Sequence, residues 1–127
     1  MYDARLVQPK DRAALEAEIK SIDVSDICVR IMRDKATFML VLLHCVRNAV
    51  ANIIKKEMIA SGGDATVSQH TVGCAQQKTD VLLMGTIAHY KKFIAKMRMQ
   101  GAYLEEKESE YRAVSGEVEG ILKPDLQ

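Results

Sequence analysis

The stretch from Thr37 to Val46 (TFMLVLLHCV) constrains the fold more than any other part of this sequence. It is rich in residues that favour strands, and it is almost continuously apolar. Such a run is typical of a strand buried on both faces of a sheet, because a strand with one exposed face alternates apolar and polar residues. Asp80 to Gly85 (DVLLMG) is a second run of this kind. We therefore expect a sheet that is covered by helices.

Four segments with helical periodicity surround these strands. They are expected to run from Pro9 to Ile22, from Asn48 to Gly62, from Thr86 to Met97 and from Gly101 to Pro124. Pro suits a first helical turn, Asn and Thr suit N-caps, and Gly suits a left-handed helix end. Each segment carries an apolar stripe: Leu15, Ile19 and Ile22; Val50, Ile53, Ile54 and Met58; Ile87, Tyr90, Phe93, Ile94 and Met97; Leu104, Tyr111, Val114, Val118 and Ile121.

The remaining segments complete a small α/β domain. Tyr2–Gln8 and Ala65–Val72 are predicted as further strands, and Asp23–Lys35 is ambiguous, a loop with a short strand being one interpretation. The predicted order is β-α-β-α-β-β-α-α, which indicates a layered α/β sandwich with a mixed sheet, a crossover connection and a C-terminal helix. Residues 1–122 are expected to form one domain and residues 123–127 a tail.

Charge and cysteine content exclude several classes of function. Lys and Arg number 18 against 17 Asp and Glu, so the net charge of +1 argues against nucleic-acid binding. The longest apolar run, Phe38–Leu43, is far shorter than the roughly 20 residues of a membrane helix. Cys28, Cys45 and Cys74 form no CxxC pair and indicate thiols in a reducing compartment. Together with a charged N-terminal stretch, these features favour a cytoplasmic protein.

Charges are also distributed unevenly over the last two predicted helices. Residues 87–101 contain four basic residues and no acid, whereas residues 102–120 contain six Glu against two basic residues. These helices are expected to pair with each other or with a second copy, or to be solvated. The heptad-like spacing of the last helix leaves open whether its apolar seam packs in its own core or on a partner.

Two segments carry a family resemblance. AVANIIKKEMIASGGDATVSQ (49–69) and TDVLLMGTIAHYKKFIAKM (79–97) resemble parts of the N-terminal accessory domain that precedes the barrel in a subset of bacterial dihydropteroate synthases. The chain is too short for a (β/α)8 barrel, which needs about 250 residues. It also lacks the family's NxTPDSFxDGG signature and its Lys/Arg phosphate-binding motif. The resemblance therefore implies kinship with the accessory domain and no synthase activity.

Two glycine turns are candidate ligand sites. Gly85 and Thr86 join a strand to a helix, where backbone N–H groups could hold an anion such as phosphate. The loop at Gly63 and Asp64 could wrap a ligand with its backbone, with Asp64 as a polar contact. The alternatives are an ordinary strand-to-helix turn with a Thr cap and an ordinary helix end.

Histidines and cysteines offer little support for metal binding or nucleophilic catalysis. His44 and Cys45 are adjacent and should point to opposite faces of a strand, and His70 with Cys74 lacks a third, orienting group. Buried thiols and surface imidazoles, His89 included, are the expected outcome. We predict no catalytic residue, metal or cofactor.

Three functions remain open from the sequence. The first is a non-catalytic accessory or interaction domain that forms a homodimer. The second is a binding domain for a pterin or a phosphorylated metabolite. The third is a subunit of a split enzyme of folate metabolism, whose partner is a separate pterin-binding barrel protein.

Overall fold

The computed structural model describes residues 2–69, 77–103 and 108–127. These residues form five helices and a three-stranded sheet, which confirms the predicted α/β class with a C-terminal helix. The elements are α1 (Arg12–Lys20), α2 (Asp26–Ala36), β1 (Phe38–Arg47), α3 (Asn48–Ala60), β2 (Asp64–Val67), β3 (Lys78–Thr86), α4 (Ile87–Tyr103) and α5 (Glu108–Leu126). From β1 onward, the order of elements is the predicted one.

The sheet has the strand order β1-β3-β2, and both neighbouring pairs are antiparallel. The sequence predicts a mixed sheet, whereas both strand pairs among the described residues are antiparallel. β1 and β2 nevertheless run in the same direction on either side of β3, so the predicted crossover is present and α3 makes it. The backbone at Gly62 has a φ of 105°, which confirms the predicted left-handed end of that helix.

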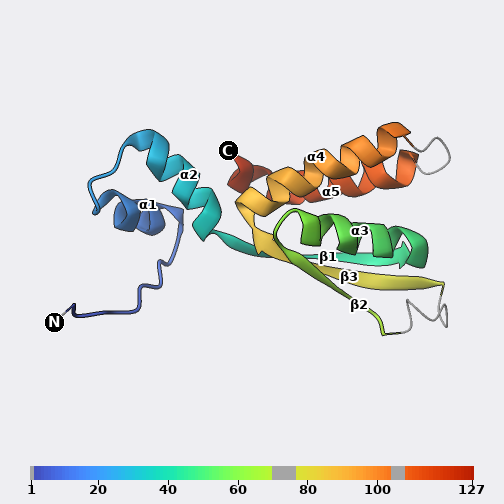
Figure 1. The fold of residues 1–127 in the computed structure, drawn as a ribbon, viewed down its shortest axis with the longest axis horizontal. Helices are drawn as coiled ribbons and strands as arrows, with labels where there is room; N and C mark the ends of the chain where they lie inside the picture. The colour runs from blue at the N-terminus through green and yellow to red at the C-terminus, as the bar shows by residue number, and fades with distance from the viewer. Residues whose placement is uncertain (1, 70–76, 104–107) are drawn as a thin grey trace.

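The core lies between the sheet and three helices that occupy one of its faces (Figure 1). All five residues of the predicted α4 stripe are buried, as are Val50, Ile54 and Met58 of α3. The hydroxyl of Tyr90 on α4 donates a 2.8 Å hydrogen bond to the carbonyl oxygen of Met39 on β1. Burial raises the pKa of Tyr90 from 10.0 to about 12 because the ionised phenolate would lose its hydration.

The expectation that β1 is buried on both faces is wrong. Val41 and Leu43 point into the core, whereas Leu40 and Leu42, on the opposite face, are exposed. The reason is the placement of the helices: α3, α4 and α5 share one face, and α1 and α2 extend away from the sheet (Figure 1). No described element covers the second face.

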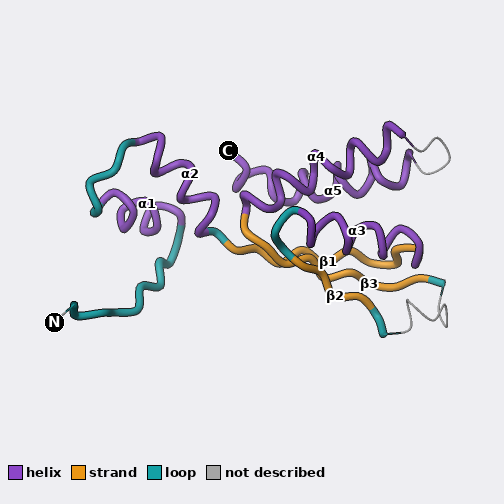
Figure 2. Tube along the Cα trace, viewed as in Figure 1, coloured by secondary structure: helices purple, strands orange, loops and turns teal. Residues whose placement is uncertain are grey.

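The first third of the chain also differs from the prediction. Residues 2–8 form no strand; they are an unpaired stretch leading into α1 (Figure 2). Asp23–Lys35 is mostly the helix α2, whose N-cap Ser25 accepts a hydrogen bond from the N–H of Cys28. None of the residues of α1 is buried. An ion pair between Arg33 and Glu16, with 2.8 Å between Nη1 and Oε1, links α1 to α2.

The last helix and the second strand have different ends from those predicted. α5 continues through Pro124 to Leu126, and its buried stripe uses Leu122 instead of Ile121, which is exposed. The position of Leu104 lies outside the described residues. β2 ends at Val67, and residues 70–72 of the predicted strand also lie outside the description.

Within the described part of the chain, no helix is long and apolar enough to cross a membrane.

Candidate functional site

The structure brings the four predicted ligand-binding residues together. Gly63 packs beside Gly85, since a Cβ atom built on Gly63 would lie 3.4 Å from the Cα of Gly85 and 2.5 Å from the carbonyl oxygen of Met84. Asp64 pairs with Met84 in the sheet, and Thr86 begins the turn into α4. At Gly63 the backbone of Met84 leaves no room for a side chain. At Gly85 a Cβ atom would lie 2.8 Å from Cε of Met58 and 3.2 Å from Cβ of His89.

Hydrogen bonds within the protein already use three of the backbone donors at this turn. The N–H of Thr86 donates to Nδ1 of His89 (3.0 Å), and the N–H of His89 faces the Thr86 hydroxyl oxygen (3.3 Å). The N–H of Ile87 donates to the carbonyl oxygen of Thr37 (2.9 Å). This is a reciprocal cap in which His replaces the usual Glu or Gln. An anion at the start of α4 would have to compete with these bonds.

A β-bulge places His44 and Cys45 differently from the prediction. The register between β1 and β3 shifts between Leu43 and Val46, and Cys45 has a φ of 56°. The extra residue breaks the alternation of the strand, so His44 and Cys45 are both exposed. The expectation of a buried thiol is wrong for Cys45, and Cys28 is only half-buried.

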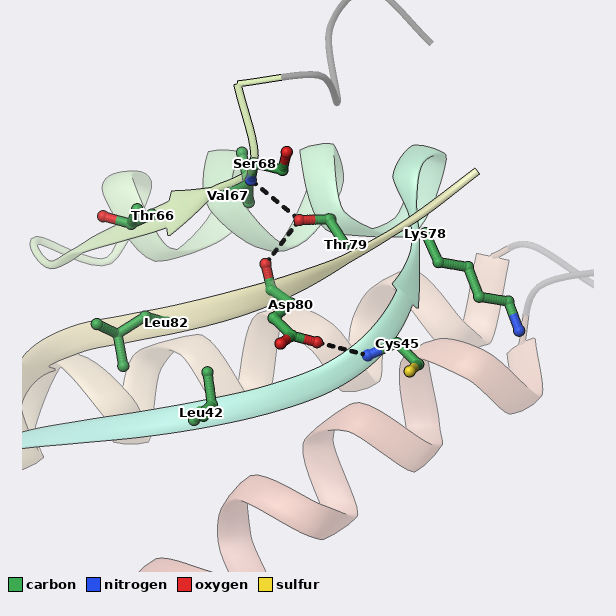
Figure 3. Close-up of a pocket in the computed structure, with 9 residues that line it drawn as sticks. All are labelled: Leu42, Cys45, Thr66, Val67, Ser68, Lys78, Thr79, Asp80 and Leu82. Atoms are coloured by element: carbon green, nitrogen blue, oxygen red, sulfur yellow. Dashed lines mark hydrogen bonds between the residues drawn. The ribbon is translucent and has the colours of Figure 1, made fainter. Parts of the chain in front are cut away.

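Asp80 holds this bulge from the neighbouring strand. Its Oδ1 accepts a hydrogen bond from the N–H of Cys45 (3.1 Å; Figure 3). Its Oδ2 lies 3.4 Å from Nδ1 of His44. The Cys45 amide, and to a lesser extent His44, hold the pKa of Asp80 below its ordinary value. No group of three ligands in the described residues could hold a metal ion. His70 and Cys74 lie outside the description.

The uncovered face of the sheet is the most distinctive surface of the molecule. Leu42, Leu82 and Thr66 stand opposite one another across the three strands, and the helices lie behind them (Figure 3). A shallow hollow of about 540 Å³ lies at this end of the face. It is lined by Leu42, Cys45, Thr66, Val67, Ser68, Lys78, Thr79, Asp80 and Leu82.

Three residues of β1 form what we call the outer stripe. Phe38, Leu40 and Leu42 have exposed fractions of 60%, 61% and 51%. Leu82 and Met84 of β3 lie beside the stripe and are half-buried. An antiparallel sheet with one solvated face is normally polar on that face. Clustered apolar side chains on such a face are typical of a surface that binds another molecule.

A groove runs between β1 and α5, and it is called the edge groove below. None of the described strands pairs with this edge of β1. The groove has a volume of about 520 Å³ and is lined by Val41, Leu42, Leu43, His44, Val46, Val114, Glu117, Gly120 and Ile121. Arg47 donates two 2.8 Å hydrogen bonds to the carboxylate of Glu110, and both residues line an adjoining hollow that shares Glu117 with the groove. The side chain of Glu117 pairs with no described residue.

The basic and acidic helices meet within the chain. Arg98 of α4 forms an ion pair with Glu119 of α5. Lys91 pairs instead with Asp34 on α2, at 2.6 Å between Nζ and Oδ2. The charge asymmetry in the sequence thus serves in part to join α4 to its neighbours.

No protein-family model matches the chain, and no curated protein or solved structure is significantly similar to it. The relation to the accessory domain of dihydropteroate synthases therefore remains a prediction from residues 49–69 and 79–97.

Proposed function

We propose that this chain is a non-catalytic interaction domain that binds a second copy of itself through the outer stripe and the adjoining edge of β1. A single observation carries the proposal: Phe38, Leu40 and Leu42 form an apolar row that no described element covers. An uncharged apolar row fits a second copy of itself across a two-fold axis. The net charge of +1 leaves little long-range repulsion between copies.

Energetic considerations indicate that the edge of β1 takes part as well. Burying the half-exposed stripes of two copies contributes roughly 5–9 kcal/mol, from about 1.5–3 kcal/mol for each fully buried side chain. Association itself costs about 4–15 kcal/mol in lost freedom of motion. The stripe alone therefore supports weak association. Backbone pairing along the edge of β1 would add the further contacts that a stable dimer needs.

The test is to place a charge in the stripe. Leu40→Lys puts an ammonium group at the centre of the proposed contact, and we expect the dissociation constant of the dimer to rise at least about 100-fold. Sedimentation velocity over a range of micromolar concentrations measures it. Ile59→Lys is the matched control, because Ile59 is 50% exposed on α3, away from the sheet face. This variant should associate like the original chain.

Two results would reject the proposal. One is a strictly monomeric original chain at about 100 μM. The other is equal association of the Leu40→Lys and original chains. A monomer whose Leu40 and Leu42 become protected only on adding a pterin-binding barrel protein would instead support the split-enzyme hypothesis.

A further inference from the structure

The segment from Ala4 to Gln8 has the character of a strand but does not pair with any described strand. Its sequence, ARLVQ, places Leu6 and Val7 between polar residues, and Leu6 is 82% exposed. Val7, near its end, lines a hollow together with Phe38 at the start of β1, and the residues before it lead away from the sheet (Figure 2). Arg5 makes one described contact, an exposed ion pair with Glu18 at 3.7 Å, which contributes little stability.

The edge groove has properties that complement those of the segment Ala4–Gln8. β1 carries no charged residue from Phe38 to Leu43, and this is the kind of edge that readily accepts another strand. The groove has an apolar floor and a carboxylate, Glu117, without a partner among the described residues. We propose that two copies exchange strands: Ala4–Gln8 of each copy pairs with β1 of the other. This inference rests on the proposed self-association and specifies its contacts.

In one antiparallel register, Arg5, Leu6 and Val7 each lie next to residues that match their polarity. If Leu6 lies opposite Leu42, then Val7 lies opposite Val41 and Arg5 lies opposite Leu43. Because alternate residues share a face, Leu6 extends the outer stripe while Arg5 and Val7 enter the edge groove. Leu43 and Glu117 line the same groove, so Arg5 comes to lie beside Glu117.

The length of the segment and the length of the surface along α5 agree with this register. Arg47 and Glu110 line a hollow that adjoins the edge groove, and together the two hollows extend along α5 from Glu110 to Ile121. From Glu110 to Ile121 the helix rises about 16 Å. A strand from Ala4 to Gln8 spans about 13 Å. A segment antiparallel to β1 therefore runs from Ala4, at the end nearer Arg47, to Gln8, at the end nearer Ile121, within the length of the two hollows.

Exchanging the charges of Arg5 and Glu117 tests the pairing. Arg5→Glu and Glu117→Arg each create two repulsive contacts in a dimer, and each variant should weaken association roughly 100-fold, at about tenfold per contact. In an equimolar mixture of the two variants, both contacts of a mixed dimer are attractive again. We expect that mixture to associate within about threefold of the original chain, as measured by sedimentation velocity.

Controls separate the possible outcomes. Arg30→Glu makes the same charge change at an exposed position on α2 and should leave association unchanged. If the single variants dimerise normally, the exchange is wrong while the proposed self-association stands. If the double variant Arg5→Glu/Glu117→Arg associates like the original chain but the mixture of single variants does not, the segment pairs with its own β1 and the exchange is again wrong. A monomeric original chain would reject both proposals.

Discussion

Gly62 and Gly63 make the corner at which α3 turns into β2. The chain needs a positive φ at Gly62, and it needs free space at both residues because the ring of His89 and the backbone of Met84 are in contact range. The ring of His89 is held there by its hydrogen bond from Thr86. At the residue scale, the glycine pair is explained by packing, and a ligand is not required.

Substitution of Gly62 measures this requirement. In Gly62→Ala, the new Cβ would lie 2.7 Å from Cδ2 of His89 on a backbone with a φ of 105°. We expect the free energy of unfolding to fall by about 1–3 kcal/mol in urea denaturation. Gly116→Ala is the control, because nothing lies within 4 Å of its Cβ position on α5. It should raise stability by about 0.5–1 kcal/mol, and equal losses in both variants would contradict this account.

At the scale of the element, α4 is joined to β1 by the buried hydroxyl of Tyr90. The folded pKa of Tyr90 is raised from 10.0 to about 12, so its contribution to stability is complete below pH 10 and is lost as the pH rises towards 12. We expect an alkaline loss on the order of 2 kcal/mol, measured by chemical denaturation between pH 9 and 11.5. In Tyr90→Phe this part of the pH dependence should disappear. A retained alkaline transition in Tyr90→Phe would assign it to other groups.

Elements with one buried face were predictable from the sequence. The five residues of the α4 stripe recur with the helical period, and all five are buried. In α2 the alternation of Ile27, Val29 and Ile31 suggested a strand, whereas the Ser25 cap and the helical spacing of Val29 and Arg33 fit the observed helix. For Tyr2–Gln8, strand-forming residues were present but a partner strand was not. Local sequence does not contain that information.

The candidate site was only partly predictable for a related reason. Gly63, Asp64, Gly85 and Thr86 were identified, and they do lie together. The outer stripe was missed because a strand that is apolar on both sides has the same pattern whether helices or another molecule cover its second face. The bulge at Cys45 has no signal in the sequence, since it depends on the position of Asp80 in the neighbouring strand.

At the scale of the whole molecule, the described helices cover only one face of the sheet. The thermal stability of the protein is therefore expected to depend on protein concentration. If copies associate through the uncovered face, the melting temperature should rise roughly 2–4 °C for each tenfold increase in protein concentration. Differential scanning calorimetry at several concentrations measures this. In Leu42→Lys the melting temperature should not depend on concentration. Identical melting temperatures for the original chain over a hundredfold range would argue against association in the folded state.

The ion pair between Arg33 and Glu16 has a consequence for the geometry of an assembly. It joins α1 to α2, the two helices that lie between the segment Ala4–Gln8 and β1 in the chain. If copies exchange that segment, the angle between the donated segment and the accepting edge decides whether the assembly closes or grows into an open filament. A change at this ion pair would then alter the size of the assemblies, even with every contact surface intact.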